Sequence, residues 1–234
     1  MKHKIPYNII MQDGFTLEVY YTVIKLNDKG IKNISVNIVI ENSIIVNDKK
    51  NKNRKRIREL LNTKSYREVI EFNADTLLLI NNSGIKAFVF ADEREHDKID
   101  NIKVFKYYLY LSFRIKVEHK HYTSSNILNL AYKLKISDAS VMTYNKKLIE
   151  LKLIQTHNFL LYKEDKASLS KTYYMLHSLP DKTKNRIVRN LWHTYKELDY
   201  DTVITLDSKQ KAIASEKTSR TIKNNIKNNE QKEQ

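Results

Sequence analysis

Phosphate binding is the chemistry that the side chains of this sequence suit best. Seven basic residues and no acidic residue lie between Lys49 and Arg58. Such a run can neutralise the phosphates of a polyanion and release the counterions condensed on them. We therefore predict contacts with nucleic-acid phosphates from five members of this run: Lys52, Arg54, Lys55, Arg56 and Arg58.

The composition of the whole chain indicates the same class of partner. Of its 234 residues, 42 are Lys or Arg and 27 are Asp or Glu, which gives a formal net charge of +15. A codon bias toward Lys, Asn and Ile would spread this charge evenly along the chain. Instead the basic run contrasts with an acidic stretch over residues 92–100. The uneven distribution favours nucleic-acid binding over compositional bias.

Several other function classes lack the residues they need. The chain has no cysteine, which excludes disulfides, zinc ribbons and a thiol nucleophile and fits a reducing cytoplasm. Its three glycines, Gly14, Gly30 and Gly84, lie too far apart for a glycine-rich phosphate loop. No apolar run approaches the roughly 18 residues of a membrane helix, and the N-terminus has no apolar signal segment. We expect a cytoplasmic protein with no cofactor, no membrane contact and no identifiable small-molecule effector.

Two clusters could serve catalysis. His119 and His121, followed by Tyr122, resemble the metal-binding histidines and nucleophilic tyrosine of nicking enzymes that open rolling-circle replication. Lys120 between the histidines would repel a metal ion, so solvated loop histidines are the preferred interpretation. The four acidic residues within 92–97 have no ordered ligand spacing and are interpreted as an acidic linker. We predict no catalytic residue and no metal site.

Hydrophobic periodicity predicts helices that alternate with short strands. The predicted helices are Phe15–Leu26, Arg54–Lys64, Val104–Val117, Ser124–Leu134, Asp138–Leu151 and Lys182–Leu198. The predicted strands are a hairpin of Thr76–Ile80 with Ile85–Ala91, and a second pair, Ile154–Tyr162 and Lys171–His177, around a polar loop. The β-branched run in Ile34–Val46 favours a strand, with a short helix as the alternative. The expected fold class is α+β, mainly helical with small β-hairpins.

The charged stretch Asp92–Asn101 is the predicted domain boundary. It separates an N-terminal domain over residues 1–95 from a second domain over 102–200 that ends with the last helix. Residues 208–234 are almost entirely polar. They cannot bury enough apolar surface to offset their ordering entropy, which predicts a disordered tail.

The segment Ile127–Ile154 carries the most specific motif. An apolar-Ala pair on a first helix precedes an apolar-Ser turn, and a Val-centred second helix ends in two spaced leucines before a hairpin. The matching residues are Leu130, Ala131, Leu134, Ile136, Ser137, Val141, Leu148, Leu151, Leu153 and Ile154. This segment resembles the winged helix-turn-helix family of DNA-binding domains. Two glycines of the family pattern are replaced by Lys135 and Lys152, and lysine can tolerate a near-helical turn at these positions.

The resemblance implies that the helix after Ser137 lies in a DNA major groove. Ser137 caps this helix, and Val141, Leu148 and Leu151 face the core. The residues then expected to contact bases or phosphates are Ser137, Ser140, Thr143, Asn145, Lys146 and Lys147. The wing lysines expected to reach the DNA backbone or the minor groove are Lys163, Lys166 and Lys171.

The N-terminal half has the same predicted order of helix, short element, basic helix and hairpin. Two winged helices in tandem are similar to plasmid replication initiators and to regulators of phages and other mobile elements. We predict sequence-specific binding of double-stranded DNA that regulates transcription or initiates replication, with a homodimer formed through Val104–Val117 or Lys182–Leu198. The alternatives are a non-enzymatic interaction scaffold whose basic charge binds RNA or anionic lipid, and a DNA-nicking enzyme.

Overall fold

The chain forms two compact units, Met1–Val117 and Glu118–Gln234, by its internal contacts. The computed structural model describes residues 1–31, 34–43, 50–61, 70–73, 76–79, 87–118, 120–163, 166–198 and 200–206. Both units combine helices with small antiparallel sheets, so the α+β class is confirmed. The unit boundary follows the helix at 104–117 instead of preceding it. The tail predicted for residues 208–234 lies outside the described residues.

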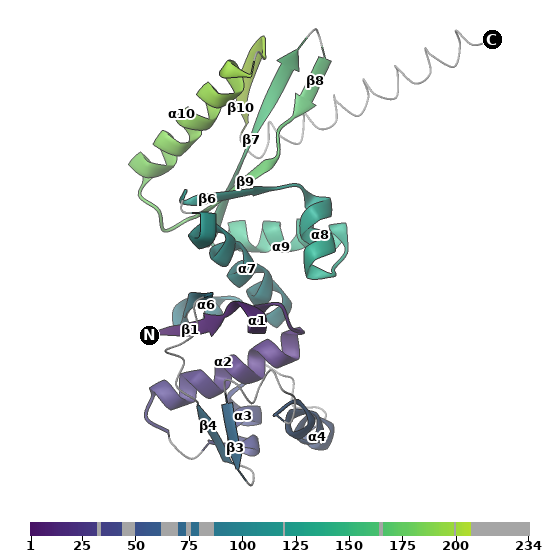
Figure 1. Ribbon diagram of the computed structural model, residues 1–234, viewed down its shortest axis with the longest axis vertical. Coiled ribbons are helices and arrows are strands. Elements are labelled where there is room, and N and C mark those ends of the chain that lie inside the picture. Colours follow the sequence, from purple (N-terminus) through teal and green to yellow (C-terminus); the bar gives the residue numbers. More distant parts are fainter. Residues whose placement is uncertain are drawn as a thin grey trace, which may run out of the picture. The chain divides into compact units, whose positions relative to one another are not determined.

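The first unit is built around two long helices, α2 and α7 (Figure 1). Its elements are β1 (Lys2–Pro6), α1 (Tyr7–Ile10), α2 (Gly14–Asp28), β2 (Ile34–Ser35), α3 (Val36–Asn42), α4 (Lys50–Leu61), β3 (Ile70–Asn73), β4 (Thr76–Leu79), β5 (Phe88–Asp92), α6 (Glu93–Lys98) and α7 (Ile102–Glu118). Asp13 begins α2 by accepting the amide of Thr16 at 2.7 Å. Gly30, with φ of 84°, follows its C-terminus in the left-handed conformation expected after a helix.

Aromatic side chains form the core of this unit. Tyr21 of α2 meets Phe105 of α7 with ring centroids 5.2 Å apart, and Tyr7 stacks on Phe113 at 4.1 Å. The aromatic side chains of α7 are buried in this core. The homodimer predicted through Val104–Val117 stays a prediction, with Val117 as the large apolar side chain of α7 that is exposed.

The predicted acidic linker is instead an ordered turn and helix. Asp92 ends β5 and caps α6, with Glu95 completing a capping box. The Lys29 ammonium donates to the Glu93 carboxylate at 2.6 Å and holds the pKa of that carboxyl down at about 2, and Lys25 at 3.2 Å adds to the effect. These acidic residues therefore bind α6 to α2.

Two strand predictions in this unit are wrong. The β-branched run favoured a strand over Ile34–Val46, but among the described residues of that range Ile34–Ser35 form a two-residue strand and Val36–Asn42 form helix α3, which Ser35 caps by accepting the amide of Ile38 at 3.3 Å. The predicted hairpin of Thr76–Ile80 with Ile85–Ala91 does not form. Its first part, β4, pairs with β3 and β2, whereas β5 pairs with β1. The strand just before β4, and for β5 a strand at the start of the chain, replaced the predicted pairing.

The second unit places helices around a longer antiparallel sheet (Figure 1). Its elements are β6 (Tyr122–Ser125), α8 (Ile127–Leu134), α9 (Asp138–Glu150), β7 (Ile154–Lys163), β8 (Lys166–Leu169), β9 (Thr172–Leu176), α10 (Asp181–Glu197) and β10 (Thr202–Leu206). The strand β6 replaces the start of the helix predicted at Ser124–Leu134, because Asn126, and neither Ser124 nor Ser125, caps α8. The predicted polar loop after β7 contains β8.

Both units contain an order of strand, two helices and two strands, apart from the short strand β8 that the second unit adds between its last two, and these strands have the same spatial order. In the first unit α2, β2, α3, α4, β3 and β4 follow one another, and the sheet order is β2-β4-β3. In the second unit β6, α8, α9, β7 and β9 follow α7 along the chain, and these strands lie in the order β6-β9-β7. In each sheet the last strand of the set therefore lies between the other two.

Candidate nucleic-acid interface

The turns after α8 and α9 each use a left-handed lysine. Lys135 has φ of 54° and ψ of 47°, and Lys152 after α9 has φ of 55°. The amide of Ile136 donates to the carbonyl of Ala131 at 3.0 Å and closes the last turn of α8. A left-handed residue therefore ends each helix abruptly and redirects the chain.

Glycine at Lys135 or Lys152 is expected to stabilise the second unit. The left-handed conformation costs a non-glycine residue roughly 1–2 kcal/mol, of which the extra entropy of unfolded glycine offsets part. We expect a net gain of about 0.5–1 kcal/mol for each substitution, measured by urea unfolding followed through Trp192 fluorescence. Lys133→Gly, inside α8, is the matched control and should lose about 1 kcal/mol. Destabilisation by both turn substitutions would contradict the left-handed geometry.

Helix α9 has one buried and one exposed face. The Ser137 hydroxyl accepts the amide of Ser140 at 3.1 Å, which confirms the predicted N-cap. Val141 and Leu148 are fully buried and attach the helix to its unit. The exposed residues of α9 are Asp138, Ala139, Met142, Thr143, Lys146 and Glu150. These positions follow helical spacing and share the face opposite the buried residues.

Three of the predicted α9 contacts are engaged inside the unit. The hydroxyls of Ser137 and Ser140 lie 2.9 Å apart at the helix cap. Asn145 is half-buried, and its Nδ2 donates to the Tyr174 hydroxyl of β9 at 3.3 Å. These three side chains therefore position α9, and Tyr174, which no local pattern identifies, is the anchor for Asn145.

Thr143 and Lys146 lie on the exposed face of α9. The Thr143 hydroxyl donates to the Ala139 carbonyl at 2.9 Å, which leaves its lone pairs free to accept from a base amino group. Lys146 is 79% exposed with its ammonium 4.0 Å from Glu150, a weak surface pair. Lys147 is half-buried at the edge of this face. The side chains at the centre of this face are therefore uncharged and either small or apolar, which suits contact with base edges.

The hairpin beyond α9 carries the wing lysines. The second half of β7 pairs with β8, and Lys163 stands opposite Lys166 at the end of this ladder. Lys171 precedes β9, which pairs with the first half of β7 instead. All three lysines are exposed, and the structure brings Lys163 and Lys166 together at the tip of the hairpin while Lys171 lies near its base.

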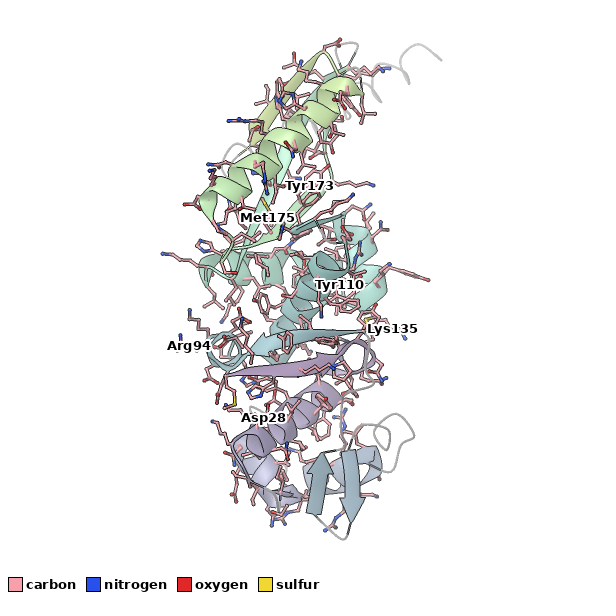
Figure 2. The ribbon with its side chains drawn as sticks, turned by 60° about the vertical axis from the view of Figure 1, so that its left-hand side comes forward. Asp28, Arg94, Tyr110, Lys135, Tyr173 and Met175 are labelled. Carbon is pink, nitrogen blue, oxygen red and sulfur yellow. The ribbon has the colours of Figure 1, made fainter. Side chains whose placement is uncertain are left out.

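Helix α10 supports the wing from one side. Tyr173 and Met175 of β9 lie next to this helix in Figure 2 and belong to one buried cluster with Phe159, Ile187 and Leu191. The Tyr173 and Tyr195 hydroxyls are 2.6 Å apart. Burial raises the pKa of Tyr173, and the hydrogen bond to Tyr195 adds to the effect. The packed helix keeps β7 and β9 rigid beneath the hairpin.

The predicted phosphate-binding helix α4 uses two arginines within the first unit. Arg54 donates from Nε to the Asn37 side-chain oxygen at 2.8 Å. Arg56 donates to the Asp13 carboxylate at 3.2 Å, and its guanidinium lies 4.1 Å from the centre of the Phe15 ring. These contacts connect α4 to α3 and to the start of α2. Both arginines therefore position the helix in addition to carrying charge.

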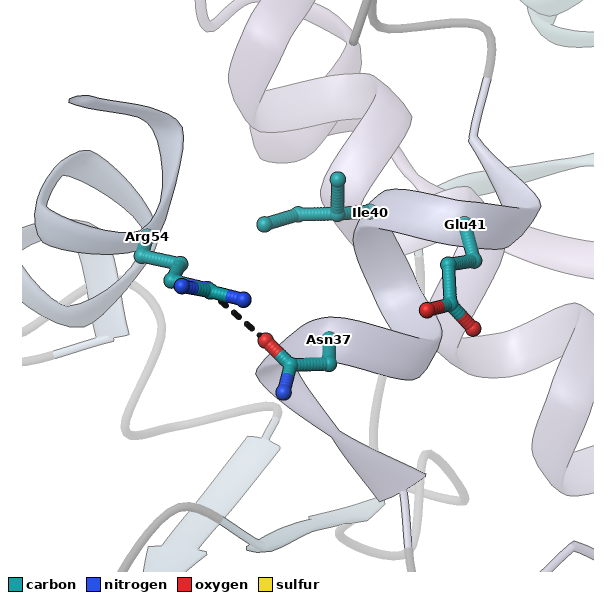
Figure 3. Close-up of a pocket in the computed structure, with 4 residues that line it drawn as sticks. All are labelled: Asn37, Ile40, Glu41 and Arg54. Atoms are coloured by element: carbon teal, nitrogen blue, oxygen red, sulfur yellow. Dashed lines mark hydrogen bonds between the residues drawn. The ribbon is translucent and has the colours of Figure 1, made fainter. Parts of the chain in front are cut away.

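A shallow hollow lies between α3 and α4. Figure 3 shows Arg54 reaching from α4 toward Asn37, with Ile40 and Glu41 completing the lining. The Glu41 carboxylate would repel a phosphate at this position. The hollow therefore does not suit an anionic ligand.

Lys55 and Arg58 are exposed on α4. Lys55 is 82% exposed, with its ammonium 3.9 Å from Glu59. An exposed pair of this kind contributes little, so a phosphate can replace the carboxylate readily. The side chain of Lys52 lies outside the described residues.

The described residues do not form a catalytic site for either of the two clusters considered for catalysis. His121 is exposed with φ of 62°, and His119 lies outside the described residues. Within the described ranges, no three His, Asp or Glu side chains come together in a way that could hold a metal ion. The nicking alternative therefore lacks an assembled site in the part of the chain that can be inspected.

No protein-family model matches this chain, and neither a curated protein nor a solved structure matches it. Among the described residues, none of the helices has the length and apolar character needed to cross a membrane.

Proposed function

We propose that this protein binds double-stranded DNA sequence-specifically through two winged helix-turn-helix modules in tandem. The observation that carries the proposal is the repeated order of strand, two helices and two strands, with the third strand central in both sheets. A winged helix requires this order, because the second helix of the pair must lie against the sheet and still present one face to a groove. In the two units these second helices are α4 and α9.

In this proposal α9 reads bases and the surrounding cations bind phosphates. Met142, 60% exposed, and Ala139 can contact thymine methyl groups, while Thr143 accepts from an amino group of adenine or cytosine. Lys55 and Arg58 on α4, and Lys163 and Lys166 at the hairpin tip, supply phosphate contacts.

The biological role we propose is transcriptional regulation or replication initiation for a plasmid, phage or other mobile element, in the cytoplasm. Both roles use the same DNA contacts. A homodimer would read paired half-sites about one helical turn apart. Selection of bound duplexes from a random pool separates the roles: direct repeats indicate replication initiation, and an inverted repeat indicates a dimeric regulator.

Thr143→Ala tests the base-reading face. We expect it to reduce the preference for the selected sequence at one base pair by about 1–3 kcal/mol, because a base amino group loses its acceptor. Thr143→Ser keeps the acceptor and should retain most of the preference. Affinities for selected and random duplexes are measured by fluorescence anisotropy at fixed salt.

Lys55→Ala is the matched control for this experiment. Lys55 is expected to bind phosphate only, so its loss should weaken selected and random duplexes equally. If Thr143→Ala also lowers both affinities equally, α9 does not read bases and the assignment is wrong.

An interaction scaffold is the second candidate, and an exposed apolar patch on α8 favours it. Leu128 is 65% exposed and Tyr132 is 86% exposed, and both line a hollow with Ala131 and Ile136. Exposed patches of this kind mark contacts with other proteins. Leu128→Ser with Tyr132→Ser should leave DNA affinity unchanged if DNA is the partner of this protein. Binding of RNA or anionic vesicles without preference for duplex DNA would favour the scaffold.

A further inference from the structure

Helix α10 carries a second basic surface, on the face away from the sheet. Lys182, Arg186, Arg189 and His193 are all exposed and follow i, i+4, i+7, i+11 spacing. At 3.6 residues per turn, these four side chains lie within an arc of about 60°. The buried residues Ile187 and Leu191 lie on the opposite side of the helix. We define the four exposed residues as the α10 stripe.

The side chains of the α10 stripe make few contacts with the described part of the unit: the His193 ring lies 5.1 Å from the Trp192 ring, centre to centre, and the other three side chains extend outward. Within the part of the chain that the structure describes, none of the four forms a hydrogen bond or an ion pair. Other cations of α10 are committed: Lys184 is buried and donates to Asp181 at 3.1 Å, and Lys196 donates to the Asp201 carbonyl at 2.6 Å. The stripe is therefore preorganised by the packed helix and open to an external anion.

The α10 stripe and the α9 face point to opposite sides of one sheet. On β9, Tyr173 contacts Tyr195 of α10, whereas the next residue, Tyr174, accepts from Asn145 of α9. Successive side chains of a strand project to opposite faces, so α9 and α10 cover opposite faces of β7 and β9. The outer surfaces of the two helices therefore face away from each other. A straight duplex lying on α9 cannot also lie on the α10 stripe.

We propose that the α10 stripe binds the phosphate backbone of a second duplex DNA segment, so that one chain holds two duplexes. The stripe extends over 11 residues, or about 16 Å, close to five base pairs at 3.4 Å each. Its two arginines suit phosphate oxygens, because a planar guanidinium can donate two parallel hydrogen bonds to one phosphate. Binding of the second duplex depends on the α10 stripe alone. Bridging of two duplexes by one chain also rests on the proposed DNA-binding function of α9.

Duplex capture by the full chain tests this proposal. A 20-base-pair duplex selected by the protein is immobilised, the protein is bound, and a fluorescent duplex of unrelated sequence is added. We expect the wild-type chain to retain the second duplex. The double variant Arg186→Glu, Arg189→Glu should lose that retention by at least about tenfold. Its affinity for the immobilised duplex should stay within about twofold, because the substituted residues are exposed and distant from α9.

The double variant Lys98→Glu, Lys103→Glu is the matched control, with the same change of charge on exposed residues of the first unit. It should retain the second duplex. If the α10 variant still retains the second duplex, the proposal is overturned. Bridging by a dimer or by α4 would give that result. The wild-type chain is also tested for capture of duplex RNA and of phosphatidylserine vesicles. If the α10 variant loses that capture while its capture of DNA is unchanged, DNA is not the ligand of the stripe.

Failure of the proposed function gives a different result. If selection yields no preferred duplex, α9 is not a reading helix. The α10 stripe is then tested by filter binding of the unrelated duplex alone, where the α10 variant should still bind at least about tenfold more weakly than the control variant. Equal binding by the two variants would mean that the α10 stripe does not bind DNA.

Discussion

Raising the salt concentration from 50 to 200 mM is expected to weaken the binding of selected duplex DNA by about 10³–10⁵-fold. The chain carries a net charge of +15, and we expect its cations to neutralise about 6–10 phosphates. Each neutralised phosphate contributes about −0.9 to the slope of log affinity against log salt, which gives a total slope of about −5 to −9. Fluorescence anisotropy titrations at five salt concentrations measure this slope.

Single substitutions give this slope an internal control. Lys55→Ala should reduce its magnitude by about 1, because one phosphate contact is lost. Thr143→Ala should leave the slope unchanged, because Thr143 carries no charge. A slope shallower than about −2 would mean that the net charge is not used on DNA. That result would favour the interaction scaffold.

Local sequence patterns predict the helices well where a cap and a period coincide. Ser137 caps α9, and the spacing of Val141 and Leu148 places both in the core, as their complete burial confirms. The same reasoning applies to α2, where Asp13 and Gly30 mark the two ends. Capping and periodicity depend on neighbours within a few residues, so one sequence is enough to detect them.

Pairing between distant segments explains most of the errors. Lys2 pairs with Asp92 in the β1–β5 ribbon, and no local pattern in either strand identifies the other. The β-branched residues of α3 become helical because Ser35 caps them and tertiary packing overrides their strand propensity.

The candidate site shows the same limit. Asn145 has a position on α9 that suits a base contact, yet it binds Tyr174, which lies 29 residues away in sequence. Arg56 likewise binds Asp13, 43 residues away. The sequence identifies which residue types can bind DNA, but the structure decides which of them are already used to hold the helices in place.

Leu148→Ala is expected to destabilise the second unit by about 2–5 kcal/mol, because Leu148 is fully buried and its truncation leaves a cavity beneath α9. This loss is a large part of the roughly 5–15 kcal/mol that stabilises a typical domain. Trp192 is the only tryptophan of the chain and packs on the core of this unit, so its fluorescence during thermal unfolding reports the change. DNA affinity should fall in proportion to the unfolded fraction, and low temperature should restore it.

Met142→Ala on the same helix is the matched substitution, because Met142 is 60% exposed. We expect it to change the stability by no more than about 0.5 kcal/mol, while it weakens the binding of the selected duplex through loss of an apolar base contact. The two variants together therefore separate attachment of α9 from recognition by α9. If Met142→Ala destabilises the unit as strongly as Leu148→Ala, its side chain is covered by protein, and the face assigned to the DNA groove is not available.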